Sequence, residues 1–148
     1  MALHFSKNWP LVTSAQIDAF ERDYSLELPC KYKRFLMTVN GGQSSSDLCF
    51  QVPSLQQKIM LGGLNGISNN APPSVQIPLL MEEFEYPNRW VPLGDDPGGN
   101  PILLSTTQTD FGRIYYWDKI GLLSKHTPAD IHLISEDFSS FLELLGNC

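Results

Sequence analysis

The sequence lacks the features of a membrane protein and of a disulfide-rich one. No apolar run approaches the roughly 20 residues that a membrane-spanning helix needs, so we expect no membrane association. The opening MALHFSKNWP is interrupted by polar side chains and does not resemble a secretory signal. Cysteine is scarce, since Cys30, Cys49 and Cys148 are an odd number, far apart and without CxxC spacing. We therefore expect free thiols, no disulfide framework, and a cytoplasmic protein.

The motifs of common metal, phosphate and catalytic sites are also missing. None of the three histidines has a cysteine or histidine partner at ligand spacing. Asp95 and Asp96 precede glycines as in a calcium loop, but Thr106 stands where a bidentate glutamate belongs. No Lys-Ser/Thr pair follows those glycines, and no G-x-S-x-G elbow is present. We expect no metal, no cofactor and no catalysis, although a triad assembled from distant residues stays open.

Acidic residues are concentrated in the second half of the chain. The 148 residues carry a net charge of −6. Residues 1–74 hold six basic and five acidic side chains, net +1, whereas residues 75–148 hold four and eleven, net −7. An acidic half repels phosphate backbones, so nucleic acid is not expected as a partner. It attracts a basic protein and speeds the encounter, although such charge also serves ordinary solubility.

Two helices are predicted near the N-terminus. Thr13 and Gln16 have the spacing of a capping box, and apolar residues at helical spacing then predict a helix over about residues 14–24. A second helix is expected to begin after Leu28-Pro29 and to end at the glycine pair 41–42. Its apolar stripe consists of Tyr32, Phe35, Leu36 and Val39.

Short strands and two further helices are predicted for the rest of the chain. The expected strands are 48–52, 58–64, 89–93, 101–105 and 113–118. A short helix is expected over 79–86, and Gly, Asn and Pro predict a surface loop over 65–78. The last helix is expected to start at Ser135 and to end at Gly146. Helices, then a sheet, then a closing helix favour one α+β domain over residues 1–148.

Three segments together resemble the SUKH superfamily, which includes the yeast cell-wall assembly regulator and many bacterial relatives. LELPCKYKRFLMTVNGG (26–42) is similar to the family's helix that ends in N-G-G. WVPLGDDPGGNPILLS (90–105) is similar to its strand–turn–strand motif, although Pro97 departs from it, and GRIYYWD (112–118) is similar to the strand that follows. The closing DFSSFLELL resembles the family's last helix, so the resemblance covers residues 13–146.

The resemblance implies a fold and a kind of function. The fold would be a twisted, mixed or antiparallel sheet flanked by helices, without catalytic machinery. The function would be protein binding, by an immunity protein that neutralises a bacterial toxin such as a basic nuclease or deaminase. The alternative is a regulatory or scaffolding module related to the cell-wall assembly regulator.

Acidic side chains are the first candidates for binding such a partner. Glu82, Glu83 and Glu85 form the densest acidic cluster, and we expect Asp95 and Asp96 to be exposed in the glycine-rich turn. We hypothesise that these five carboxylates dominate the capture of a basic toxin.

Tryptophans of the strand segments are the second candidates. Trp90 and Trp117 are potential hot spots, although a tryptophan on a strand more often belongs to the core. Asn100 and the glycines near it are expected to shape the turn rather than to bind a ligand.

Overall fold

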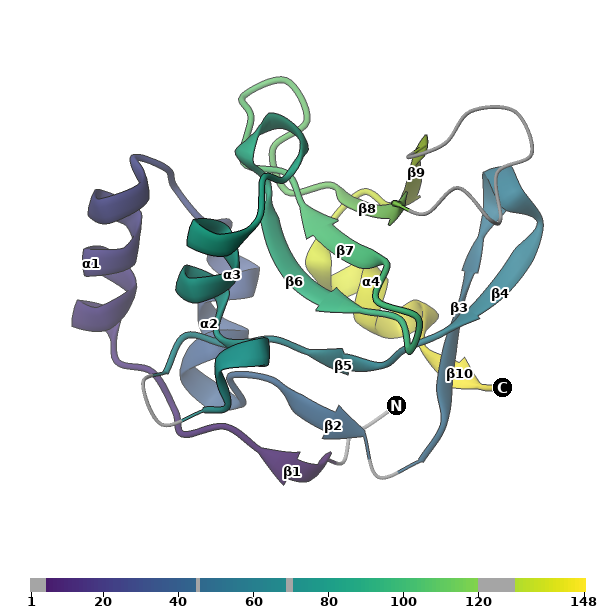
Figure 1. Ribbon diagram of the computed structural model, residues 1–148, viewed down its shortest axis with the longest axis horizontal. Helices are drawn as coiled ribbons and strands as arrows, with labels where there is room; N and C mark the ends of the chain where they lie inside the picture. The colour runs from purple at the N-terminus through teal and green to yellow at the C-terminus, as the bar shows by residue number, and fades with distance from the viewer. Residues whose placement is uncertain (1–4, 45, 69–70, 120–129) are drawn as a thin grey trace.

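The computed structural model describes residues 5–44, 46–68, 71–119 and 130–148, and Figure 1 shows how its elements are arranged. The elements in chain order are β1 (Phe5–Asn8), α1 (Ser14–Tyr24), α2 (Cys30–Thr38), β2 (Gly42–Ser44), β3 (Leu48–Val52), η1 (Pro53–Leu55), β4 (Gln57–Met60), β5 (Gly63–Leu64), η2 (Pro73–Val75), α3 (Ile77–Glu83), η3 (Pro87–Arg89), β6 (Val91–Asp95), β7 (Pro101–Leu104), β8 (Ile114–Asp118), β9 (Asp130–Ser135), α4 (Phe138–Leu144) and β10 (Gly146–Asn147).

Two antiparallel sheets form the frame of the molecule. The larger has seven strands in the order β1-β2-β5-β6-β7-β8-β9, and the smaller has the order β10-β3-β4. Every pair of named strands is antiparallel, as expected where short turns join neighbours. The α+β prediction is confirmed. None of the helices in the described ranges has the length and apolarity that crossing a bilayer takes.

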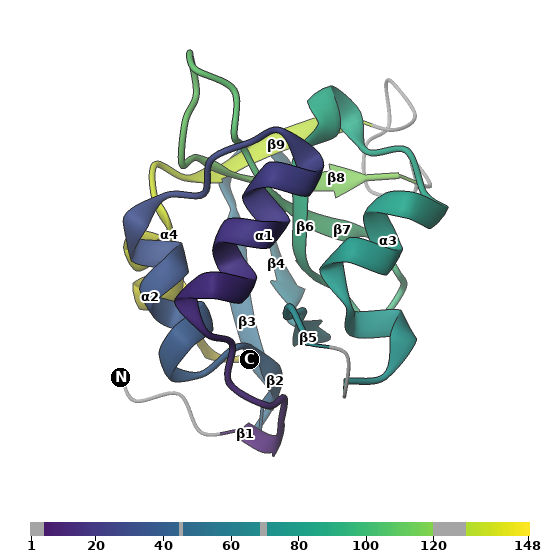
Figure 2. The same ribbon diagram turned by 90° about the vertical axis from the view of Figure 1, so that its left-hand side faces the viewer.

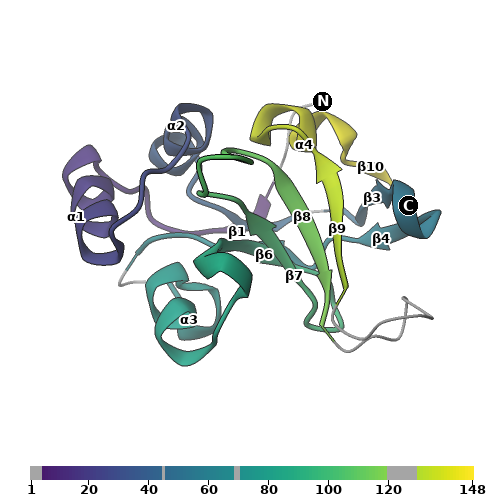
Figure 3. The same cartoon turned by 90° about the horizontal axis from the view of Figure 1, so that it is seen from above.

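Helices cover both faces of the larger sheet. Figure 3 shows α2 and α4 on one side of strands β6–β9 and α3 on the other, and Figure 2 shows α1 between α2 and α3. The α4 side holds an aromatic core, in which Phe50 packs edge-on against Tyr116 and Phe141 with ring centroids 6.1 and 5.7 Å apart. Tyr32 on α2 meets Phe138 on α4 in the same way, at 5.0 Å. Edge-to-face rings of this kind stabilise a core beyond the area they bury.

The first two helices form where the sequence predicts them. Thr13 and Gln16 make the capping box, because the Thr13 hydroxyl accepts the Gln16 N–H and the Gln16 side chain accepts the Thr13 N–H. After α2, Asn40 and Gly41 adopt positive φ angles of 64° and 98°. A Cβ on Gly41 would lie 2.6 Å from the carbonyl oxygen of Asn65, so only glycine fits there.

The segment 65–78 differs from the predicted surface loop. Asn65, Ile67 and Ile77 are buried, and Gly66 forms a bridge with Gln76. The buried Asn40 side chain accepts the Ile67 N–H and donates to the Ile67 carbonyl oxygen. These side-chain hydrogen bonds take the place of strand pairing. The irregular backbone can therefore be buried while its N–H and C=O groups stay hydrogen-bonded.

The closing helix and four strands also differ from the prediction. Ser135 is the last residue of β9, where it pairs with Ile114, and the helix starts only at Phe138. Asp137 is its N-cap, accepting the Ser140 N–H at 2.8 Å. The strands β1, β2, β9 and β10 were not predicted. β1, β2 and β10 have two to four residues and no β-branched ones, so they depend on their neighbours for pairing, whereas β9 (DIHLIS) was overlooked.

The prediction of free thiols is wrong for two of the three cysteines. β10 pairs with β3 with Gly146 opposite Cys49, which brings the Cα atoms of Cys49 and Cys148 to 5.1 Å, and the two form a disulfide. Cys30 is free and exposed. Pairing across 99 residues leaves no trace in the local sequence. Because disulfides persist mainly in oxidising compartments, cysteine usage no longer supports a cytoplasmic location.

The predicted exposure of Asp96 is also wrong. Asp96 is 8% exposed, and its carboxylate accepts the Asn100 N–H at 2.8 Å and the Tyr116 hydroxyl at 2.5 Å. Asn100 Nδ2 in turn donates to the Tyr116 oxygen, and Asn100 Oδ1 accepts the Lys119 N–H at 3.0 Å. This network, Asp96–Asn100–Tyr116, closes the turn between β6 and β7 and ties it to β8. The Asn100 side chain was expected to bond the backbone of the turn, but it bonds Asp96, Tyr116 and the Lys119 N–H, and only the Asn100 backbone bonds the backbone of the turn.

Removing the disulfide should destabilise the protein. We expect Cys148→Ser to lower the free energy of unfolding by about 2–5 kcal/mol, because the reduced unfolded chain regains the entropy of an open loop. Urea unfolding without reductant measures the change. Cys30→Ser is the matched control and should leave stability unchanged, while equal stability of Cys148→Ser and the parent would contradict the pairing.

The buried network should be sensitive to loss of one hydroxyl group. We expect Tyr116→Phe to cost about 1–3 kcal/mol in urea unfolding, since the buried Asp96 carboxylate loses its shortest hydrogen bond. Tyr115→Phe is the control on the same strand, because the Tyr115 hydroxyl donates to the half-buried Asp110. It should cost about 1 kcal/mol or less. An equal cost for both variants would argue against a special role for the network.

Candidate functional site

The structure separates the predicted partner-binding residues into buried and accessible ones. Trp90 is 4% exposed, stacks on Tyr115 at a centroid distance of 4.5 Å, and donates its indole N–H to Thr107. Asp96 is held inside the turn network. Both therefore have clear structural roles, and their contact with a partner stays a prediction. Trp117 is half-buried on the outer face of β8.

The three glutamates at the end of α3 are exposed but line different grooves. Glu82 accepts a hydrogen bond from the Tyr24 hydroxyl at 3.2 Å and lines the space between α1 and α3. Glu85 lines a second groove, and Glu83 lines a third together with Asp95. The predicted acidic cluster is thus three separate positions around one helix end.

Three aromatic rings, which we call the aromatic ridge, form a row in which two line both the second and third grooves and the third packs against one of them. The ridge consists of Phe84, Tyr86 and Trp117. Phe84 and Tyr86 are 6.4 Å apart between ring centroids, and Tyr86 and Trp117 are 6.3 Å apart, both edge to face. The Phe84 side of the ridge is open to solvent, because Phe84 is 40% exposed. A contiguous, partly exposed aromatic surface of this kind is a candidate interaction site.

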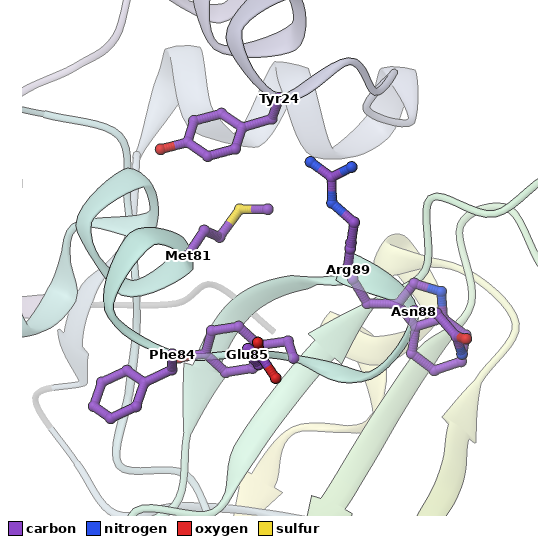
Figure 4. A pocket seen from close by; sticks show the side chains of 8 residues that line it. Tyr24, Met81, Phe84, Glu85, Asn88 and Arg89 are labelled. Carbon is purple, nitrogen blue, oxygen red and sulfur yellow. The ribbon is translucent and has the colours of Figure 1, made fainter.

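The groove on one side of the ridge, the arginine groove, has a volume of about 440 Å³. Figure 4 shows Tyr24 from α1, Met81 from α3 and Arg89 from η3 converging on this space, while Phe84 points away from it. Asn88 and Arg89 have φ angles of 53° and 58°. Two successive non-glycine residues in the left-handed region are strained, and here they direct Arg89 toward Tyr24.

The groove on the other side, the lysine groove, has a volume of about 340 Å³. It is lined by Glu83, Phe84, Tyr86, Asp95 and Lys119 among others. The Lys119 ammonium lies 4.8 Å from the centre of the Phe84 ring and 5.7 Å from that of Trp117. Both distances are within the range of a cation–π interaction.

The lysine groove contains two carboxyl groups, Glu83 and Asp95, and the ionisation of one of them is disfavoured. Burial raises the pKa of Asp95 from 3.8 to about 6, and the neighbouring Asp96 adds to the shift. Burial also raises the pKa of Tyr86 to about 12, with further contributions from Asp95 and Glu83. A carboxyl group in such surroundings gains from a nearby cation, because a cation favours its charged form.

The outer face of β8 and β9 continues the apolar surface beyond the ridge. Ile131 pairs with Trp117 and Leu133 pairs with Tyr115, and each aliphatic side chain is 38% exposed. Sequence reasoning missed these two residues, together with Phe84 and Lys119. The sequence signal that could have pointed to Phe84 is the run F-E-Y at residues 84–86, in which two aromatic residues stand next to the glutamates.

One Ser–His contact bears on the open question of a dispersed triad. Ser54 Oγ lies 2.6 Å from His132 Nδ1, while His132 Nε2 is buried and, among the described residues, has no hydrogen-bond partner. The acid that orients a catalytic histidine is therefore missing from this pair in the described part of the chain. Nor do three His, Cys, Asp or Glu side chains of those residues converge as metal ligands.

Comparison with known proteins places the chain in a family. No curated protein matches the sequence. The sequence profile of the SMI1 / KNR4 family (SUKH-1) matches residues 11–144, which include both helices of the N-terminal half, the β6–β7 turn and the whole of α4. The chain therefore belongs to the SMI1 / KNR4 family (SUKH-1), a family of protein-interaction domains.

Proposed function

We propose that this protein is an immunity protein, which binds and neutralises a basic bacterial toxin domain through the aromatic ridge and the two grooves beside it. The observation that carries the proposal is the partly exposed aromatic ridge among carboxylates on an interaction domain. Aromatic side chains supply most binding energy at protein interfaces, and surrounding charges select the partner.

The charge of the chain supports a basic partner. Of its net charge of −6, residues 75–148 supply −7, and the ridge and its grooves lie mainly within this half. Glu83, Glu85 and Asp95 surround the ridge without forming any of the three ion pairs of the described residues. Such carboxylates speed the encounter with a basic nuclease or deaminase.

A cytoplasmic location belongs to the proposal, since an immunity protein acts in the cytoplasm of the cell it protects. Reducing systems there would hold Cys49 and Cys148 as thiols. The protein would then depend on its aromatic core and on the Asp96–Asn100–Tyr116 network for stability.

The direct test is co-expression with the protein that the adjacent gene encodes. We expect the parent protein to form a complex with that protein and to restore growth of cells that express it. Neutralising Glu83→Gln, Glu85→Gln and Asp95→Asn together should slow association about ten-fold at low ionic strength, because steering is lost. Surface plasmon resonance at several salt concentrations measures the association rate.

The matched control removes three exposed carboxylates elsewhere, Asp18→Asn, Asp47→Asn and Glu143→Gln. It changes the net charge equally and should retain more than half of the association rate. If both triple variants slow association equally, the slowing comes from the net charge of the protein and not from the position of the carboxylates around the ridge. Absence of both binding and protection would contradict the proposal and favour the regulatory or scaffolding role of the family.

Binding should also depend on pH through Asp95. Its carboxyl group has a pKa of about 6, so it becomes neutral as the pH falls and no longer attracts a cation. We expect affinity for the toxin to decrease between about pH 7.5 and about pH 5, and to decrease less in Asp95→Asn. Titration calorimetry of the parent protein and of Asp95→Asn across this pH range checks the difference. If the affinity of both depends on pH in the same way, Asp95 is not the group that causes the dependence.

A further inference from the structure

The lysine groove combines the two features by which proteins hold a cationic side chain. The rings of Phe84 and Tyr86 line it, Trp117 packs against Tyr86 beside it, and the carboxylates of Glu83 and Asp95 lie in the same groove. Rings attract a cation through their negative faces, and a carboxylate supplies a charged acceptor.

The groove already holds a cation of this chain, the Lys119 ammonium, which lies against aromatic rings. Lys119 lies over Phe84 and Trp117, and within the described part of the chain it is not in an ion pair with Glu83 or Asp95. The Lys119 side chain is exposed, so it can leave without uncovering a core. Its backbone is fixed separately, because its N–H donates to Asn100 Oδ1.

Among the described residues Glu83 and Asp95 form no ion pair, so the carboxylates of the groove can accept a cation. Asp95 is half-buried, and the two effects on its ionisation, burial and Asp96, both oppose its charge. A guanidinium group is planar, stacks on aromatic faces and bonds a carboxylate through two parallel N–H groups. It can therefore contact the ridge and a carboxylate at the same time, which Lys119 does not do here.

We propose that the lysine groove receives an arginine side chain of the partner protein, and that Lys119 occupies its aromatic wall until that arginine displaces it. The identity of the partner as a basic toxin rests on the function proposed above. The chemistry of the groove does not, because it depends only on Glu83, Phe84, Asp95, Trp117 and Lys119.

The groove can be tested without the partner. The probe is Nα-acetyl-arginine methylamide, titrated into the full-length protein while the indole N–H resonance of Trp117 is followed by NMR, with Trp117→Phe used for its assignment. We expect a saturable shift in the parent protein. In Lys119→Ala the probe should bind about two- to five-fold more tightly, since the competing cation is gone.

The controls separate displacement from general charge effects. Lys58→Ala removes an exposed lysine on β4 and should leave the affinity for the probe unchanged. The neutral citrulline analogue should cause no shift, and Glu83→Gln with Asp95→Asn should weaken binding of the arginine probe at least five-fold by loss of the charged acceptors. The dispersion of the amide spectrum confirms that each variant is folded.

Three results would overturn the inference. One is no shift of the Trp117 indole in Lys119→Ala, a second is equal shifts with the citrulline analogue, and a third is tighter binding of the corresponding lysine probe. Failure of the toxin assays with an intact arginine response would refute the proposed function alone. Loss of the arginine response with intact toxin binding would refute the groove alone.

Discussion

The buried network of Asp96, Asn100 and Tyr116 is the constraint on which the binding surface depends. It fixes the turn between β6 and β7, and through the Lys119 N–H it also fixes the end of β8. Burying a carboxylate costs free energy unless it is hydrogen-bonded. Conformations of the turn that break the hydrogen bonds to Asp96 are therefore disfavoured. The turn that most resembles a ligand loop in the sequence is therefore a structural device that places Asp95 and Lys119.

The alternation of side chains along β8 divides the protein into a core and a binding surface. Tyr116 points to the α4 side, where it meets Phe50, while Tyr115 and Trp117 point to the other side. Because successive residues of a strand face opposite sides, one strand serves both. The sheet thus holds Trp117, the strand residue of the ridge, in place, and a side chain that is already held loses less entropy when it binds.

The sequence predicted features whose cause is local. The capping box of α1, the apolar stripe of α2 and the turn role of Asn100 all follow from residues within a few positions of one another. Features made by distant segments were missed, because nothing in the local sequence reports them. Asp96 is buried by Tyr116 from β8, and Cys49 reaches Cys148 only through the pairing of β10 with β3. Glu82, Glu83 and Glu85 looked like one cluster, but they line separate grooves.

The sequence by itself determined the α+β class, the family resemblance, the acidic second half and the first two helices with the capping box of α1. These depend on composition and short-range periodicity, which the chain carries in any conformation. Only the tertiary structure decided which acidic and aromatic side chains are accessible, and that Phe84, Tyr86, Trp117 and Lys119 meet. The physical reason is that burial and pairing are properties of packed segments, so they arise only when α3, β6 and β8 are brought together.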